Sequence, residues 1–451
     1  MQRINRRTFL GAAGATVLSA AAPGASGAPR TNLKGTRPNI IFILADDLGY
    51  GDLGCYGQRM IRTPHLDRMA REGIRFTDCY AGSTICAPSR CCLMTGYHTG
   101  HAHIRGNERI PLRPEDVTVA ELLKEAGYKT AVIGKWGLGE PETTGIPNRK
   151  GFDYWFGYLN QTHAHYYYTD YLWRNEEKVS IPEGTYSHDL FTEEALQWVR
   201  QNREGPFFLY LAYTIPHALS ENPEDGMPVP SDYPYGETDW PQNQKNHAAM
   251  ITRMDRDIGR LLALLSELGI DDRTLVLFSS DNGTHREGGA IPEFFNSSGP
   301  LRGIKRDLYE GGIRVPMITR WPGRIRPGQT SDQVWAFWDF LPTACTLAGI
   351  RSPAGIDGLD MSPALLGRRL PHPPLYWEFH EGRFAQAVRD GLWKAVRNDA
   401  GLPVELYDLK EDIGEQRDLA GQHPDVAARM AGLMEEMRTE SEHWPGKKQG
   451  R

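Results

Sequence analysis

Four polar side chains of the sequence could together hold a divalent cation. Asp46, Asp47, Asp281 and Asn282 supply three carboxylates and one amide oxygen. An all-oxygen set of this kind suits Ca²⁺ or Mg²⁺, whereas Zn²⁺ more often takes thiolate and imidazole ligands. Either pair taken alone is typical of a turn or a helix cap. Because the two pairs follow separate predicted strands, we interpret them as one metal site for Ca²⁺, with Mg²⁺ as the alternative.

Cys86 is a second centre of possible chemistry. Pro88 is typical of the first turn of a helix, so Cys86 is predicted to lie just before a helix N-terminus, where unpaired N–H groups favour an anion. Three interpretations are open at this point: a buried structural cysteine, a thiolate nucleophile of lowered pKa, or a metal ligand. The third fits poorly, since Cys86, Cys91 and Cys92 lack the paired spacing of common metal sites.

Four apolar runs are predicted to be strands that are buried on both faces. Each is followed within a few residues by polar groups: Asp46-Asp47 after 39–44, Lys135 after 130–133, His217 after 207–211, and Asp281-Asn282 after 274–278. Runs of this kind indicate a parallel sheet. Because ligands bind outside the carboxyl ends of parallel strands, we expect these polar groups to meet at one edge.

Helical patterns lie between these strands and predict an α/β fold around a mainly parallel sheet. They cover 118–127, where Thr118 and Glu121 form a predicted capping box, as well as 192–205 and 247–269. After about residue 350 the pattern changes. Short segments at 375–379, 384–388, 393–396 and 405–409 predict a small antiparallel sheet, followed by a helix from Pro424 to about Glu440.

The first 28 residues resemble a twin-arginine export signal peptide. Arg6-Arg7 precedes a weakly apolar stretch and a region of small residues that reaches Ala28. The apolar run is shorter than the roughly 20 residues that a membrane span needs, so we predict no transmembrane segment in the mature chain. We expect export of the folded chain by the twin-arginine machinery, to the periplasm or out of the cell.

The charge of the chain excludes partners that are recognised by a basic surface. Its 451 residues include 51 Lys and Arg against 57 Asp and Glu, a net charge of −6. Loss of residues 1–28, with Arg3, Arg6 and Arg7 and no acid, would leave −9. We therefore expect no nucleic-acid partner, and any chemistry on an anion requires a local cluster of cations. Six cysteines are too few for a disulfide scaffold.

The chain resembles the type I sulfatases along most of its mature length. The resemblance rests on Cys86-Ala87-Pro88-Ser89-Arg90 with Leu93-Met94-Thr95-Gly96, and on Ala45-Asp46-Asp47-Leu48-Gly49, Gly134-Lys135-Trp136, Pro216-His217, Ser280-Asp281-Asn282-Gly283, and Leu301-Arg302-Gly303-Ile304-Lys305 followed by 309–316. It implies an alkaline-phosphatase-like α/β/α core with a smaller C-terminal α+β domain. We place the catalytic domain at 36–355 and the small one at 370–445.

The resemblance also implies a mechanism. A maturation enzyme would oxidise Cys86 to formylglycine, whose hydrate supplies one hydroxyl to attack sulfur and a second through which sulfate is expelled. The modified Cys86 would lie at the metal, beside the four oxygen ligands named above. Arg90 would stabilise the hydrate, Lys135 and Lys305 would balance the charge of the transferring group, and His217 would be the acid for the leaving oxygen.

Gly137 departs from the family pattern, which has a His two residues after the Lys. His163 and His165, in the aromatic stretch 160–168, are the candidates for the vacant role, and which of them acts is open. The alternative for this stretch is an exposed aromatic loop with incidental histidines. A similar stretch occurs in galactosamine-sulfatase-like bacterial enzymes that lack the first His. We also place Arg105 near the substrate and interpret His101 as structural.

The function that the resemblance implies is a sulfuric ester hydrolase acting on a sulfated carbohydrate, with galactose or N-acetylgalactosamine sulfates favoured. Export and many aromatic residues suit a sulfated polysaccharide, because Trp and Tyr faces stack on sugars. Two alternatives are open. One is a phosphate or phosphonate monoester hydrolase of the same superfamily. The other is a degenerate sulfatase that binds glycans without turnover, for which Gly137 is the only supporting residue.

Overall fold

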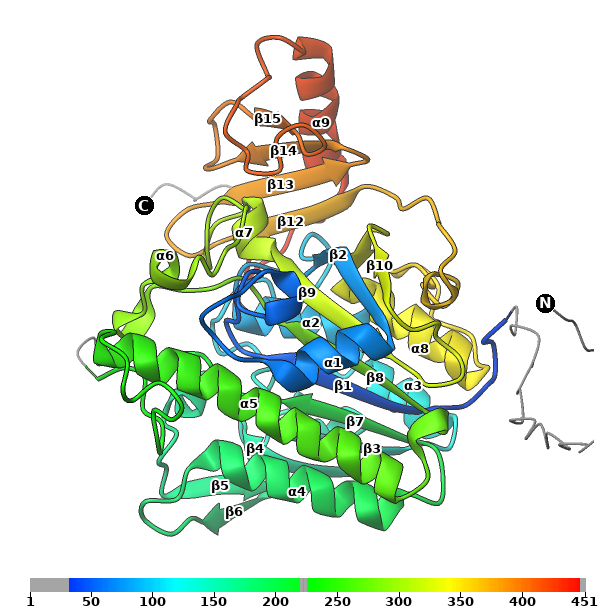
Figure 1. The fold of residues 1–451 in the computed structure, drawn as a ribbon. Helices are drawn as coiled ribbons and strands as arrows, with labels where there is room; N and C mark the ends of the chain where they lie inside the picture. The colour runs from blue at the N-terminus through cyan, green and yellow to red at the C-terminus, as the bar shows by residue number, and fades with distance from the viewer. Residues whose placement is uncertain (1–31, 220–221, 223–224, 447–451) are drawn as a thin grey trace, which may run out of the picture. The chain divides into compact units, whose positions relative to one another are not determined.

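A large twisted sheet organises the part of the chain that the computed structural model describes, residues 32–219, 222 and 225–446 (Figure 1). Its eleven strands are β1 (Asn39–Ala45), β2 (Ile74–Tyr80), β3 (Lys129–Lys135), β4 (Tyr154–Tyr158), β5 (Tyr171–Arg174), β6 (Glu177–Ser180), β7 (Phe207–Ala212), β8 (Thr274–Ser280), β9 (Arg314–Arg320), β10 (Gln329–Ser331) and β11 (Trp335–Ala336). They follow the order β10-β2-β9-β8-β1-β7-β3-β4-β5-β6, with β11 paired to β2.

The four strands predicted from apolar runs form the centre of this sheet. β8, β1, β7 and β3 are neighbours and run parallel to one another. Every residue of β1, β7 and β8 is buried, which agrees with their nearly continuous apolar sequences. The antiparallel pairs lie toward the two sides, where β9 joins β2 to β8 and where β5 pairs with β4 and β6.

Helices cover both faces of the sheet. Ile40, Phe42 and Leu44 of β1 pack into a core with α2 (Cys86–Thr95), α3 (Val119–Glu125) and α8 (Phe340–Ala348). The alternate residues Ile41 and Ile43 pack into a second core with α1 (Pro64–Glu72), α4 (Ser187–Asn202) and α5 (Gln242–Glu267), which cross in front of the sheet in Figure 1. The predicted α/β fold is confirmed, as an α/β/α arrangement. The short helices α6 (Pro292–Phe295) and α7 (Glu310–Ile313) lie in loops that follow β8.

The C-terminal region forms the predicted antiparallel sheet. Its strands β12 (Leu375–Phe379), β13 (Ala385–Asp390), β14 (Trp393–Arg397) and β15 (Glu405–Asp408) pair in sequence order, and α9 (Pro424–Glu436) packs on them. This sheet is bonded to the core, since Trp377 Nε1 donates to the carbonyl of Ala81 at 2.9 Å. The division into separate domains at 36–355 and 370–445 stays a prediction.

Several helix boundaries differ from the predicted ones. The helices α4 and α5 begin five residues earlier than expected, at Ser187 and Gln242, because their first turns carry polar residues outside the apolar stripe. The helix α9 ends at Glu436, short of Glu440. Cys86 is the first residue of α2 and does not precede it. The capping box of Thr118 and Glu121 is present as predicted.

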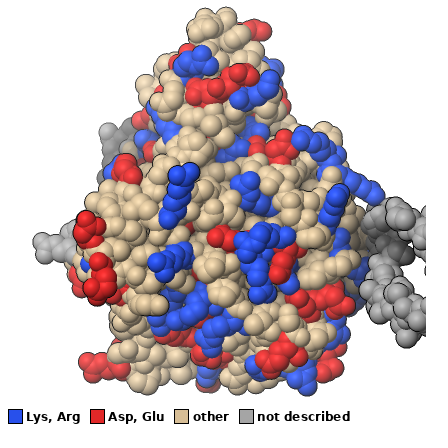
Figure 2. Space-filling view, in the orientation of Figure 1, with Lys and Arg blue, Asp and Glu red and all other residues tan. Residues whose placement is uncertain are grey.

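The surface of the face shown in Figure 2 carries both signs of charge. Lys and Arg side chains are interspersed with Asp and Glu, as the small net charge leads one to expect. No helix within the described ranges is long and apolar enough to cross a membrane. The predicted signal peptide, residues 1–28, lies outside the described residues.

Candidate active site

The polar groups that follow the central strands meet at one edge of the sheet. The parallel register pairs Ala45 with Ser280 and Leu44 with Ala212, so the chain leaves β1, β7 and β8 at the same level. Asp46 and Asp281 directly follow β1 and β8, His217 lies five residues after the end of β7, and Lys135 is the last residue of β3. The backbone N–H of Asp47 donates to Asp281 Oδ1 at 3.1 Å, which joins two strand ends.

Each carboxylate of this cluster contacts its own buried cation. Arg90 donates through Nε and Nη2 to Asp281 Oδ2 at 3.0 and 2.8 Å. Lys135 Nζ lies 2.7 Å from Asp46 Oδ2, and Lys305 Nζ lies 2.8 Å from Asp47 Oδ2. All six side chains are at most 3% exposed. The cations that the sequence predicts for an anion site are therefore gathered at this edge.

Burial and neighbouring charges shift the pKa values of Asp46 and Asp281 in opposite directions. Burial alone would raise the pKa of Asp46, but Lys135 and Arg90 hold it well below its usual range. Burial and the charge of Asp46 raise the pKa of Asp281 to about 7. Three acids this close together are therefore costly to ionise unless a strong positive charge lies between them.

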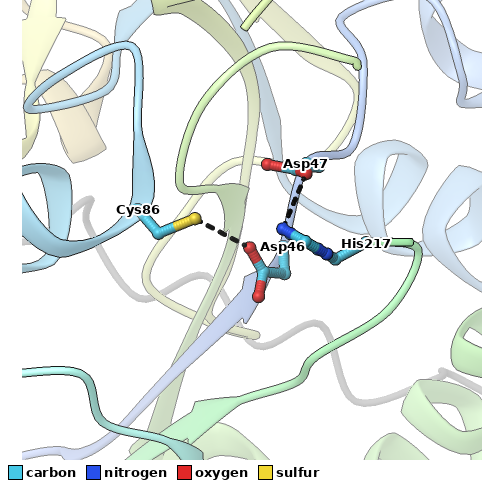
Figure 3. A group of neighbouring side chains, drawn as sticks. All are labelled: Asp46, Asp47, Cys86 and His217. Carbon is cyan, nitrogen blue, oxygen red and sulfur yellow. Dashed lines mark hydrogen bonds and ion pairs between the residues drawn. The ribbon is translucent and has the colours of Figure 1, made fainter. Parts of the chain in front are cut away.

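The donor atoms of the site fit a divalent cation. Ligand atoms of Asp46, Asp47, Cys86 and His217 all lie within 4.8 Å of one another (Figure 3). Asn282 Nδ2 donates to Asp47 Oδ1 at 2.6 Å, and the buried Asn282 Oδ1 has no hydrogen-bond partner among the described residues. An orphaned amide oxygen beside carboxylates is what a Ca²⁺ or Mg²⁺ ligand set provides. Asp47 also has a positive φ of 65°, a conformation that costs energy and is found at functional sites.

Cys86 lies against this cluster with its side chain turned toward the carboxylates. Its Sγ is 3.4 Å from Asp46 Oδ1, and only 2% of the residue is exposed (Figure 3). Burial and the charge of Asp46 raise the pKa of the Cys86 thiol well above its usual value. The surroundings therefore keep the thiol protonated, which argues against a thiolate of lowered pKa.

His217 faces the same point from the end of β7. Its Nδ1 donates to the carbonyl of Ala218 at 2.5 Å, so the neutral ring presents an unprotonated Nε2 to Lys305 Nζ at 3.0 Å. The same Nε2 is 3.3 Å from Asp47 Oδ2. Burial and Lys305 lower the pKa of His217 well below its usual value. The ring is therefore neutral and oriented toward the reacting centre.

Only one of the two loop histidines reaches the site. The ring of His165 stacks on His217 with centroids 4.0 Å apart, and burial together with His217 lowers the pKa of His165 to about 2. His163 turns away, because its Nε2 lies 2.8 Å from Thr169 Oγ1 and its ring stacks on Tyr171. The geometry thus distinguishes two histidines that the sequence leaves equivalent.

Arg105 and His101 each contact an acidic side chain of a distant part of the chain. Arg105 Nη1 lies 2.8 Å from Glu378 Oε1 of β12, and Arg105 Nη2 donates to Thr439 Oγ1 at 3.2 Å. His101 Nδ1 is 2.9 Å from Asp357 Oδ1, as a structural role requires. The contacts of Arg105 favour a structural role over substrate proximity, since the guanidinium is 2% exposed and joins the core to the C-terminal sheet.

Glu287 is a residue of this site that the sequence analysis missed. Its Oε2 lies 3.2 Å from Lys305 Nζ and 3.7 Å from His217 Nε2, and its other oxygen accepts from Arg306. Arg306, which looks like an ordinary cation in the sequence, also contacts Glu381 of the β12–β13 turn at 2.9 Å. A single Glu in a glycine-rich loop carries no signal in the sequence; only the fold brings it to Lys305.

The amino-acid sequence is similar to those of known sulfatases. Residues 38–350 match the family model described as Sulfatase, and residues 304–442 match the one described as N-sulphoglucosamine sulphohydrolase, C-terminal. N-acetylgalactosamine-6-sulfatase of Canis lupus familiaris is 36% identical over 411 residues, which cover 84% of this chain and 74% of that protein. Arylsulfatase A of Homo sapiens is 33% identical, covering 85% of this chain and 83% of that protein.

Solved structures show the same fold. The crystal structure of Ps i-CgsB in complex with k-i-k-neocarrahexaose superposes with a TM-score of 0.80 at 30% identity, covering 91% of this chain and 95% of that chain. A phosphonate monoester hydrolase of Agrobacterium radiobacter reaches a TM-score of 0.65 at 19% identity, covering 92% of this chain and 100% of that chain. At that identity the second likeness shows the fold alone.

Proposed function

Because the chain belongs to the sulfatase family and is a sulfuric ester hydrolase, we propose that it removes sulfate from a sulfated carbohydrate of the galactose or N-acetylgalactosamine type. The observation that carries this proposal is the cluster of Arg90, Lys135 and Lys305 around Cys86 and the carboxylates, which can receive a sulfate group. The galactosamine preference rests on the N-acetylgalactosamine-6-sulfatase relatives.

We propose that the oxygen atoms of Asp46, Asp47, Asp281 and Asn282 hold a divalent cation, Ca²⁺ in the first place and Mg²⁺ as the alternative. Such an ion would polarise the sulfate oxygens. The close ligand atoms of Asp46 and Asp47, the bond of Asp281 Oδ1 to the N–H of Asp47 and the orphaned Oδ1 of Asn282 support this ligand set. Cys86 Sγ lies at the edge of the same cluster, where its modified side chain would adjoin the ion.

The nucleophile proposed here comes from Cys86, after a formylglycine-generating enzyme has oxidised it. The hydrated aldehyde supplies two hydroxyls on one carbon, one for attack on sulfur and one for release of sulfate. The protonated, buried thiol supports this route over direct attack by sulfur. A sulfated thiol would also lack the second hydroxyl through which the intermediate can collapse.

The remaining residues of the site have roles that their contacts support. Arg90 and Lys135 flank the carboxylates on the side of Cys86 and balance the negative charge of the sulfate. Lys305 Nζ lies 3.0 Å from His217 Nε2 and would balance the charge of the transferring group. The negative charge of a bound sulfate ester favours a proton on His217 Nε2, which makes His217 our candidate for protonating the leaving oxygen, with His165 stacked on it as the second histidine of this side.

The place of action is proposed from the N-terminal sequence. The twin-arginine motif at Arg6-Arg7 supports export through the twin-arginine machinery, to the periplasm or out of the cell. Export of a folded chain allows both the modification of Cys86 and metal binding to precede it.

Sulfate release from a defined sugar tests the proposed function. We expect the purified protein to release sulfate from N-acetylgalactosamine 6-sulfate with a kcat/KM at least 100-fold above that for phosphate release from 4-nitrophenyl phosphate. Cys86→Ala should abolish the release, whereas Cys55→Ala, at a half-buried cysteine away from the cluster, should retain it. Phosphate release that equals or exceeds sulfate release would favour the phosphatase alternative. Tight binding of the sulfated sugar without any turnover would favour the glycan-binding alternative.

A further inference from the structure

The backbone and the surroundings at position 137 disfavour the side chain that the family pattern places there. Gly137 has a φ of +80°, which a residue with a Cβ rarely adopts. A Cβ built on Gly137 would also lie 2.1 Å from Nε2 of Gln161 and 2.9 Å from its Cδ. The carboxamide of Gln161, from the loop that carries His165, therefore fills the space next to Gly137.

The Gln161 carboxamide is poorly satisfied within the protein. Its Nε2 reaches the carbonyl of Gly137 only at 3.5 Å, at the limit of a hydrogen bond. Its Oε1 is buried and has no hydrogen-bond partner among the described residues. A buried amide oxygen without a donor is costly, and its usual partner at such a position is a ligand or a water molecule.

A small polar pocket adjoins this carboxamide. It has a volume of about 40 Å³ and is lined by Asn107, Arg109, Gly137, Glu140, Asn160 and Gln161, among others. That space admits a few atoms, such as one hydroxyl or hydroxymethyl group, but not a sugar ring. Arg109 is held only loosely, since its side chain is 64% exposed and lies 4.0 Å from Glu140. The pocket thus offers amide, carboxylate and guanidinium groups to a polar substituent.

A short stretch of chain and one hydrogen bond connect the pocket to the reacting centre. Gly137 lies two residues after Lys135, whose Nζ bonds to Asp46. Asn107 Oδ1 accepts a hydrogen bond of 3.0 Å from the backbone N–H of Ala87, the residue after Cys86. A sugar whose sulfate lies at Cys86 would therefore place a neighbouring substituent within reach of this pocket.

We propose that this pocket is a saccharide subsite, in which Gln161 binds an exocyclic hydroxyl or hydroxymethyl group of the sulfated sugar. Gln161 Oε1 accepts the hydroxyl hydrogen, and Arg109 or Asn107 donates to the hydroxyl oxygen. Gln161 is then a specificity-determining residue that stands where the family has a His, but on a different loop. The inference rests on the proposed function and adds how the sugar is oriented.

Paired substrates separate sugar recognition from sulfate chemistry. We expect Gln161→Ala to lower kcat/KM for N-acetylgalactosamine 6-sulfate about tenfold more than kcat/KM for 4-nitrophenyl sulfate, which has no hydroxyl to place in the pocket. Arg109→Ala, at a side chain that is 64% exposed, should shift the same ratio in the same direction. Gln201→Ala, at an exposed glutamine of α4, is the matched control and should leave the ratio unchanged.

A binding measurement provides a second readout that does not depend on turnover. In a Cys86→Ala background, Gln161→Ala should weaken binding of N-acetylgalactosamine 6-sulfate about tenfold and leave the binding of inorganic sulfate unchanged. Equal losses for sugar and sulfate, or an unchanged substrate ratio in both the Gln161 and Arg109 variants, would overturn the subsite. The proposed function fails separately, if the unsubstituted protein releases no sulfate from either substrate.

Discussion

At the scale of single residues, the site of this acidic protein pairs each buried carboxylate with a buried cation, so that an anion can bind there. Arg90 neutralises Asp281, Lys135 neutralises Asp46 and Lys305 neutralises Asp47, all away from water. Such pairs are strong only because the dielectric around them is low and each partner is hydrogen-bonded. The residue types at the strand ends were predictable from sequence, because each interrupts or follows an apolar run. Which cation each carboxylate contacts was not predictable from sequence.

Which of the two loop histidines lies in the site could not be predicted from the sequence. His163 and His165 are two residues apart in one aromatic stretch, and no pattern in the sequence distinguishes them. The structure does so, because the turn at 163–165 places His165 on His217 and His163 on Tyr171. Glu287 was missed for the same reason, since its role depends on a contact with Lys305 across 18 residues.

We predict that the two histidines differ sharply in function. His165→Ala should lower kcat for sulfate release by about 100-fold, because it removes the ring that packs on the candidate acid His217. His163→Ala is the matched control and should change kcat by less than about threefold, since the His163 side chain contacts Thr169, Tyr171 and Tyr158 and does not contact His217. Steady-state kinetics checks both, and a larger loss in the His163 variant would contradict the assignment.

At the scale of elements, the sequence predicted the strands whose residues are nearly all buried, and it did not predict the strands that are largely exposed. The strands β1, β3, β7 and β8 have apolar, buried centres and were predicted to within two residues at either end. The strands β5, β6 and β10 are short and largely exposed, so their sequences lack the hydrophobic pattern that identifies a strand. The helices α4 and α5 were recognised by their stripes, but their polar first turns were not.

The connection between β1 and α1 contains a buried acid that makes stability depend on pH. Burial raises the pKa of Asp52 to about 7, against hydrogen bonds from Ser297 and Gly49 that lower it. Its folded pKa is therefore above its unfolded value, so the folded state binds the extra proton and loses stability as pH rises from about 4 to about 7. The loss for this one group is at most about 1.4 kcal/mol per pH unit.

We predict that Asp52→Asn removes this part of the pH dependence. The stability of the variant relative to the unsubstituted protein should rise between pH 5 and pH 8, because the amide of the substituted side chain has no charge to bury. Urea unfolding at the two pH values measures the difference. A relative stability that stays constant, or that falls with pH, would show that Asp52 is ionised in the folded protein.

The C-terminal sheet is joined to the catalytic loops by a buried ion triad. Lys394 of β14 lies 2.9 Å from Glu310 of α7 and 2.9 Å from Glu415, and all three side chains have no exposed surface. Burial would raise the pKa of Glu310, but Lys394 and Arg314 lower it to about 2, whereas burial and Glu310 leave the pKa of Glu415 at about 7. The helix α7 begins five residues after Lys305, so the triad fixes the end of the loop that carries it.

We predict that Lys394→Met destabilises the protein by about 3–5 kcal/mol, because it removes the buried cation that Glu310 and Glu415 share. Lys410→Met, at a lysine that is 67% exposed, is the matched control and should change the free energy of unfolding by less than about 0.5 kcal/mol. Urea unfolding curves compare the two variants. Equal stability in both would mean that the C-terminal sheet docks without the triad.

At the scale of the whole molecule, we expect the proposed metal ion to matter for both stability and activity. The buried carboxylates of Asp46, Asp47 and Asp281 meet in a chain whose net charge is already −6, so an ion that binds only the folded state adds stability. We predict that EDTA lowers both the melting temperature and sulfate release. At an ion concentration 100-fold above Kd, binding contributes about 2.7 kcal/mol. Ca²⁺ should restore both properties, and Zn²⁺ should not.

The control for this prediction is an Asp281→Asn variant, which should lose most of the response to EDTA. A protein that keeps its melting temperature and its activity after the metal has been removed to below detectable levels would contradict the ligand set of Asp46, Asp47, Asp281 and Asn282.

We propose that this sulfatase works through a modified Cys86, and mass spectrometry of the peptide that contains Cys86 tests this mechanism most directly. The protein should be isolated in active form from cells that contain a formylglycine-generating enzyme, and the peptide should be reacted with a hydrazine reagent that labels aldehydes. We predict that Cys86 carries an aldehyde and takes the label, while Cys91 and Cys92 of the same helix remain thiols. An unmodified Cys86 thiol in fully active protein would contradict the account.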